Sequence, residues 1–83
     1  MNKLRQMSIF AHIVEEGSIS GAADKLDLSK SVVSQHLKSL ELELGAVLLK
    51  RTTRRQNLTE VGKTFYLECQ KLNTIAELAW SKA

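Results

Sequence analysis

Two groups of polar side chains in this sequence have the chemistry to bind a polyanion. The first combines hydroxyl, amide and ammonium groups, carried by Ser29, Lys30, Ser31, Ser34, Gln35 and Lys38. The second is the run KRTTRR at residues 50–55, in which four of six residues are basic. Hydroxyl and amide groups suit the edges of DNA bases, whereas Lys and Arg suit phosphates. Together the two groups predict double-stranded DNA as the partner.

The positive charge of the chain is local. The formal net charge is only +3, but residues 1–49 contain five Lys or Arg against six Asp or Glu, whereas residues 50–83 contain seven against three. A focused basic cluster attracts a polyanion more strongly than the same charge spread evenly. The alternative is that the cluster only keeps a surface turn soluble.

Length and composition argue against several other classes of protein. A chain of 83 residues forms one small domain with little room for a catalytic cleft, so we do not expect an enzyme. The sequence has neither an apolar run of the ~20 residues that cross a bilayer nor a signal peptide, which favours the cytoplasm over a membrane. His12, His36 and the single Cys69 lack metal-ligand spacing, so we expect no metal and no cofactor.

The spacing of apolar residues predicts helices that each bury one face. The first spans roughly residues 2–16, from a cap at Asn2 to Gly17, and its buried face consists of Leu4, Met7, Phe10, Ala11 and Val14. A shorter second helix is capped by Ser18 or Ser20 and presents Ala22, Ala23 and Leu26 to the core.

A third helix follows the turn Asp27-Leu28-Ser29, with Ser29 as its cap. Its buried stripe is Val32, Val33, Leu37, Leu40 and Leu44, and most of the candidate contact residues fall on the other side. This is the amphipathic division that a recognition helix needs. Gly45 ends the helix, and Val47-Leu48-Leu49 and Gln56-Asn57-Leu58 predict a hairpin, a wing with the basic run at its tip.

A last helix, capped by Thr59, has more apolar surface than one side can bury. Its seam is Val61, Phe65, Cys69, Leu72, Ala76 and Ala79, and Tyr66, Leu67, Ile75, Leu78 and Trp80 lie beside it. We therefore expect a second copy of the chain to pack against Leu72, Ile75, Leu78, Ala79 and Trp80.

The expected fold is mainly α: a winged helix-turn-helix, with a three-helix core and a small β-hairpin wing, followed by a long C-terminal linker helix. Residues 1–58 are expected to form the DNA-binding domain and residues 59–83 the linker and dimerisation helix.

Several short motifs follow one another along the chain. They are the helix from Phe10 to Val14, Gly17-Ser18-Ile19-Ser20-Gly21-Ala22-Ala23 with Leu26, Leu28-Ser29, Val33-Ser34-Gln35-His36-Leu37 through Leu40-Glu41, Leu44-Gly45, Leu48-Leu49-Lys50-Arg51-Thr52-Thr53-Arg54 and Leu58-Thr59-Glu60-Val61-Gly62. In this order and spacing they resemble the N-terminal DNA-binding domain of LysR-type transcriptional regulators. The resemblance implies a homodimer that regulates transcription by binding an inverted repeat. Family members continue into a larger effector-binding domain, and we expect this chain, which has none, to bind no small-molecule effector.

Chemistry and resemblance together predict a role for each candidate residue. Ser34 and Gln35 are expected on base edges, and Lys30 and Lys38 on bases or phosphates. Ser29 is expected to act as a cap and a phosphate site, while Ser18 and Ser20 are caps first and phosphate contacts second. In the wing the contact residues are Arg51, Thr53, Arg54 and Arg55. By resemblance Arg54 enters the minor groove, and the alternative role of Arg51 is to anchor the wing to the domain.

A competing interpretation is a protein-interaction module that binds a partner through its helices and whose basic wing is incidental. The wing distinguishes the two, because an interaction module has no need of four basic residues in six. We therefore favour DNA binding. Gln35 lies where many family members carry Arg, and since Gln pairs with adenine and Arg with guanine, their base preference does not carry over.

Overall fold

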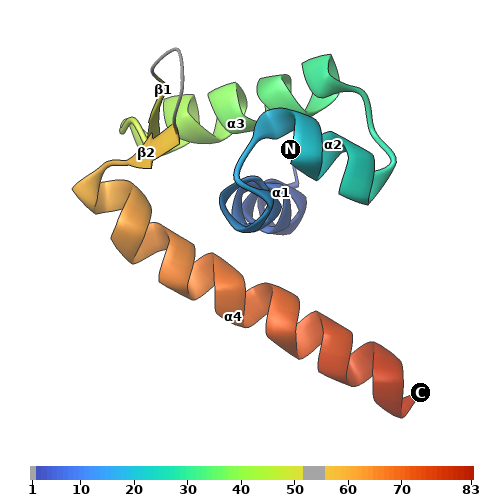
Figure 1. Ribbon diagram of the computed structural model, residues 1–83. Helices are drawn as coiled ribbons and strands as arrows, with labels where there is room; N and C mark the ends of the chain where they lie inside the picture. The colour runs from blue at the N-terminus through green and yellow to red at the C-terminus, as the bar shows by residue number, and fades with distance from the viewer. Residues whose placement is uncertain (1, 52–55) are drawn as a thin grey trace.

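The computed structural model describes residues 2–51 and 56–83, apart from the side chain of Arg51. The elements run in the order α1 (Lys3–Glu16), α2 (Ile19–Leu26), α3 (Lys30–Leu44), β1 (Leu49–Arg51), β2 (Gln56–Leu58) and α4 (Glu60–Lys82). Helices α1 to α3 form a bundle, β1 and β2 form an antiparallel hairpin, and α4 runs past α1 and beyond the bundle (Figure 1). The predicted fold class is confirmed.

Local capping explains where the helices begin and end. The side chains of Asn2, Ser18 and Thr59 accept hydrogen bonds from backbone N–H groups three residues further along, at 3.1, 2.8 and 3.0 Å. Each bond satisfies a donor that has no partner within its helix. Of the two predicted caps for α2, Ser18 is the one used. Gly17, with φ +80°, ends α1 in the left-handed region that glycine enters without strain.

The core lies where the bundle meets α4. Its largest fully buried side chains are Phe10, Ile13, Leu48, Val33 and Cys69. The rings of Phe10 and Phe65 lie 5.8 Å apart between centroids, so α4 contributes to the same core as α1. Burial, and then the nearby Glu68 carboxylate, raise the pKa of the Cys69 thiol to about 11. This cysteine therefore packs as an apolar residue, as the sequence predicts.

Part of the predicted burial pattern is wrong. Leu4 and Leu44 were expected in the core but are 61% and 44% exposed, whereas Ile9 and Ile13 are buried. Ile9 and Ile13 are buried because α1 contacts α2, α3 and α4 and so buries more than one stripe (Figure 1), whereas Leu4 and Leu44 lie at the ends of α1 and α3. The first strand also begins at Leu49, two residues later than predicted.

Polar contacts hold the first part of α4 against α1. The Tyr66 hydroxyl donates to the Glu15 carboxylate at 3.2 Å, and the Asn73 amide donates to the Ser8 carbonyl oxygen at 3.3 Å. Burial and the charge of Glu15 raise the pKa of Tyr66, so the phenol remains a donor at neutral pH. Beyond Asn73, residues 74–82 of α4 and the last residue, Ala83, are all exposed. Of the residues predicted to form one buried seam on this helix, only Cys69 is therefore buried, while Phe65 and Leu72 are partly buried and Val61, Ala76 and Ala79 are exposed.

Gly62 provides a sensitive test of how α4 begins. A Cβ atom at this position would overlap the carbonyl oxygen of Leu48 and would lie 3.2 Å from the Leu58 side chain. We predict that Gly62→Ala lowers the free energy of unfolding by about 1–3 kcal/mol, the usual cost of overpacking. Elsewhere in a helix the same change stabilises by roughly 1 kcal/mol. Urea unfolding followed by circular dichroism measures the difference.

The control for this prediction is Lys63→Ala, at the next and exposed position of α4. Its free energy of unfolding should change by no more than about 0.5 kcal/mol. A Gly62→Ala protein as stable as the parent would show that α4 does not approach Leu48 this closely.

Candidate nucleic-acid interface

The turn between α2 and α3 places the start of α3 at the surface of the bundle. Asp27 adopts the left-handed conformation, with φ 57°, which Asp tolerates better than most residues. The N–H of Leu28 then donates to the Ala23 carbonyl oxygen at 2.9 Å and closes α2. Ser29 begins the next helix by accepting a hydrogen bond from the N–H of Val32 at 3.2 Å. The predicted turn and cap are both confirmed.

Helix α3 has one buried and one exposed face. Val33, Leu37 and Leu40 are buried in the bundle. On the other side, the candidate contact residues Ser29, Lys30, Ser31, Gln35 and Lys38 are exposed, and Ser34 is partly exposed. The structure thus brings these six side chains together at the solvent-facing side of the first turns of α3. They are available to a partner in one continuous strip.

The serines differ in whether their hydroxyl groups already make hydrogen bonds within the chain. The Ser29 hydroxyl caps α3 and lies 3.3 Å from the Ser31 hydroxyl. The Ser18 hydroxyl is held by the Gly21 N–H, whereas Ser20 is exposed. The cap roles of Ser18 and Ser29 follow from these bonds, and their phosphate contacts stay predictions.

The electrostatics of this strip favour an anion. Residues 29–38 contain two lysines and no acidic residue. The next acid on α3 is Glu41, and its carboxylate accepts hydrogen bonds from the N–H groups of Leu48 and Leu49, at 2.7 and 3.3 Å. Its negative charge is therefore directed at the base of the wing. The sequence gives no signal for this role, since Glu41 resembles any other acidic residue on a helix.

The wing is a two-stranded hairpin in which Leu49 pairs with Leu58, Lys50 with Asn57 and Arg51 with Gln56. Lys50 is exposed. The predicted contact residues Thr53, Arg54 and Arg55, and the side chain of Arg51, lie outside the described residues, so their roles stay predictions.

Thr59 fixes the other end of the hairpin. Its hydroxyl donates to the Val47 carbonyl oxygen at 2.6 Å, and its N–H donates to the Leu48 carbonyl oxygen at 3.0 Å. With Glu41, this residue joins the wing both to the end of α3 and to the start of α4. The direction of the wing relative to the exposed strip of α3 is set by these bonds.

The residues predicted to dimerise lie apart from this strip, on α4. Leu72 is partly buried, and Ile75, Leu78, Ala79 and Trp80 are exposed. Within residues 2–50 and 56–83, no three His, Cys, Asp or Glu side chains form a group that could hold a metal ion. Among the same residues, no helix is long and apolar enough to cross a membrane.

A helical bundle whose third helix presents a polar strip, followed by a hairpin wing, defines a winged helix-turn-helix protein. Residues 4–63 match the family described as bacterial regulatory helix-turn-helix protein, lysR family. The chain belongs to this family, as the sequence motifs predict. The family is a class of transcription regulators, which confirms that the chain is not an enzyme.

Curated relatives include both activators and repressors. The chain is 44% identical over 72 residues to the HTH-type transcriptional activator AaeR of Escherichia coli (strain K12), covering 87% of this chain and 23% of AaeR. It is 46% identical over 72 residues to an HTH-type transcriptional repressor of Pseudomonas aeruginosa, again covering 87% and 23%. The chain therefore spans about a quarter of the length of the curated relatives it matches.

Solved structures of the same fold include DNA complexes. A crystal structure of a BenM_DBD/catB site 1 DNA complex matches with a TM-score of 0.86 at 36% identity, over 98% of this chain and 91% of that one. A CbnR_DBD-DNA complex matches with a TM-score of 0.82 at 28% identity, over 98% and 93%. The long α4 is part of both matches, because nearly the whole chain is covered.

The bonds of Glu41 lead to a prediction about the wing. Glu41→Ala leaves two N–H groups at the base of the hairpin without their acceptor, which costs about 1–3 kcal/mol of stability. We also expect the amide resonances of Leu48 and Leu49 to shift towards random-coil values in NMR spectra. Glu43→Ala, at an exposed position on the same helix, is the matched control. Equal losses in the two variants would contradict a specific role for Glu41.

Proposed function

We propose that this chain is the DNA-binding domain of a bacterial transcription regulator that binds an inverted-repeat operator as a homodimer. The observation that carries the proposal is the exposed, acid-free strip of α3 at residues 29–38 in a lysR-family fold. The DNA complexes of BenM_DBD and CbnR_DBD, which share this fold, support it. The competing interpretation as a protein-interaction module has no comparable support.

In this proposal the start of α3 enters the major groove. Ser34 and Gln35 contact base edges, Lys30 and Lys38 contact bases or phosphates, and Ser29, Ser31, Ser18 and Ser20 supply further contacts to the backbone. The wing residues Arg51, Thr53, Arg54 and Arg55 lie along the adjacent minor groove, with Arg54 inserted.

The proposal divides the chain by function. Residues 1–58 bind DNA, and residues 59–83 link and dimerise through Leu72, Ile75, Leu78, Ala79 and Trp80. The exposure of this apolar group supports the division, because an isolated domain rarely leaves so large an apolar surface uncovered. A regulator of a bacterial chromosome acts in the cytoplasm, and this chain needs neither a metal nor a small-molecule effector to do so.

Salt dependence tests the proposal as a whole. Each phosphate neutralised by Lys or Arg releases counterions, so the logarithm of the affinity should fall linearly with the logarithm of salt concentration. We predict a steep slope between about 50 and 200 mM salt, measured by fluorescence anisotropy on random and promoter-derived duplexes. Arg54→Ala and Arg55→Ala should each lower the affinity and flatten the slope by roughly one phosphate contact.

The matched control is Lys82→Ala, which removes one positive charge from the exposed last turn of α4, at the other end of this helix from the wing. Affinity and slope should match the parent. If the parent itself binds DNA independently of salt, or does not bind it, the proposed function is wrong.

Gln35 and Lys38 are predicted to make different kinds of DNA contact, Gln35 to a base and Lys38 to a phosphate. A base contact carries sequence information and a phosphate contact does not. Gln35→Ala should therefore relax one base-pair position in each half-site, by about 1–3 kcal/mol of discrimination. Lys38→Ala should weaken all duplexes by similar amounts. Binding-site selection on the parent and the two variants measures both effects, and an unchanged motif with Gln35→Ala would exclude direct base contact by this residue.

A further inference from the structure

The exposed end of α4 carries one large apolar side chain. Trp80 is 86% exposed and is the only tryptophan of the chain. It lies seven residues beyond Asn73, about two helical turns, and therefore on the same side of α4 as the buried residues Cys69 and Asn73. The side of α4 that packs on α1 thus continues beyond α1 and ends in an uncovered indole. An indole buries about 150–250 Å² when it finds a partner surface.

A cavity of suitable chemistry lies at the opposite end of α4. Its volume is about 370 Å³, and it is lined by Lys3, Met7, Leu40, Glu43, Leu44 and Phe65, where α1, α3 and α4 meet. An apolar cavity of about 150 Å³ already accommodates a benzene ring. A thioether and an ammonium group both attract the face or edge of an aromatic ring. The lining therefore suits an aromatic side chain.

The Trp80 of the same chain cannot reach this cavity. Trp80 lies fifteen residues beyond Phe65 on one continuous helix, which separates them by about 22 Å. Only a second copy of the chain can place the indole there. Whether it does so depends on how the two α4 helices lie relative to one another.

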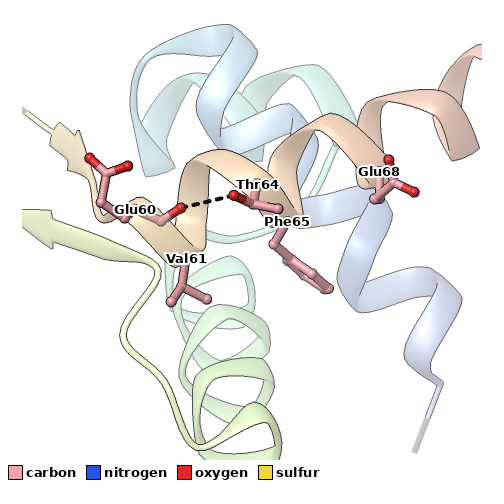
Figure 2. Close-up of a pocket in the computed structure, with 5 residues that line it drawn as sticks. All are labelled: Glu60, Val61, Thr64, Phe65 and Glu68. Atoms are coloured by element: carbon pink, nitrogen blue, oxygen red, sulfur yellow. Dashed lines mark hydrogen bonds between the residues drawn. The ribbon is translucent and has the colours of Figure 1, made fainter.

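One side of α4, partly buried at Phe65 and Leu72 and otherwise exposed, has the spacing of a coiled-coil seam. Val61, Phe65, Glu68, Leu72, Ile75 and Ala79 follow one another in steps of four and three residues. Another cavity, of about 480 Å³, is lined by Glu60, Val61, Thr64, Phe65 and Glu68, and Val61 and Phe65 project from one side of the helix towards it (Figure 2). Four residues with this spacing form the hole that receives one side chain of a paired helix.

Charge determines whether the two α4 helices pair in parallel or antiparallel orientation. Glu68 is the only charged residue of the seam, and Lys71 lies beside it with its ammonium group 2.8 Å from the Glu68 carboxylate. A parallel pair would place Glu68 against the partner's Glu68. An antiparallel pair centred between Glu68 and Leu72 instead places Glu68 near the partner's Lys71, an attractive contact made twice. The antiparallel arrangement is therefore favoured.

In that arrangement Phe65 faces the partner's Ile75, and Val61 faces the partner's Ala79. The partner's Trp80 then lies level with the first turn of α4. In an antiparallel pair the two-fold axis is perpendicular to the plane that contains the two helices. A flank that lies above this plane in one copy therefore lies above it in the other copy as well. The flank that bears the indole is also the flank that packs on α1, so the indole faces the cavity beside Phe65.

We propose that Trp80 of one copy docks in the cavity between α1, α3 and α4 of a second copy. The proposal rests on the homodimer of the proposed function and adds a contact between the end of each α4 and the helical bundle of the other copy. Two such contacts form in each dimer.

Tryptophan fluorescence tests the docking directly, because the 83-residue chain has no other tryptophan. We expect the emission to move to shorter wavelength, and acrylamide quenching to decrease, as the protein concentration passes through the dimerisation range, on the order of tens of micromolar. Sedimentation equilibrium on the same samples measures the dimer independently. Trp80→Ala should weaken the dimer by about tenfold or more, because Trp is among the residues whose truncation costs most at interfaces and each dimer loses two docked indoles.

Leu44→Glu provides the matching change in the cavity. Leu44 is 44% exposed, so the fold of a single copy tolerates a charge there, but the docked indole does not. The variant should lose the emission shift and form a dimer about tenfold weaker. Leu42→Glu is the control, since Leu42 lies on the same helix, is 78% exposed and is not part of this cavity. It should retain both the shift and the dimer.

The outcomes separate this docking from the proposals on which it rests. A dimer whose indole stays accessible to acrylamide overturns the docking alone, and so does an emission shift that survives Leu44→Glu or is lost equally with Leu42→Glu. A chain that sediments as a monomer at every concentration overturns the homodimer and the docking together. Steep salt-dependent DNA binding by that monomer would still support the nucleic-acid interface.

Discussion

The close crossing of α4 over the chain between α3 and β1 determines how the parts of this domain are arranged. Gly62 has no side chain to keep α4 away from the Leu48 carbonyl group. At the same place Thr59 donates to the Val47 and Leu48 carbonyl oxygens, and Glu41 accepts from the N–H groups of Leu48 and Leu49. The end of α3, the base of the wing and the start of α4 are thereby joined within a few residues. In a DNA-binding dimer, this junction would transmit the spacing of the two α4 helices to the spacing of the two recognition helices.

The parts of the fold that follow from local chemistry could be predicted from the sequence. Asn2, Ser29 and Thr59 were expected to begin helices, and each does so through a contact only three residues away. Burial was harder to predict, because it depends on which elements surround a helix. The periodicity of α1 suggests a single stripe that includes Leu4, but three neighbours surround this helix and bury Ile9 and Ile13 instead.

The candidate site also has features that local sequence predicts and features that it does not. The exposed strip of α3 follows from its period, so the structure places these side chains on the surface as expected. The role of Glu41 has no local signal, since its two hydrogen-bond donors lie seven and eight residues further along and come near only when the chain folds back. Which base Gln35 would contact depends on the depth and tilt of α3 in the groove. That geometry involves the DNA as well as the protein, so it is not encoded in the spacing of residues along one helix.

Phe65 connects the fold of one copy with the proposed pairing of two. Its ring packs against Phe10 in the core, and the same side chain lines both of the cavities that a second copy would fill. Filling these cavities would add contacts to a side chain that already holds α4 on α1. Because only the folded chain presents the two cavities, pairing would stabilise the fold by mass action. The stability of the domain and the occupation of the dimer would then rise together with protein concentration, so that the form that binds an inverted repeat would also be the most stable form of the chain.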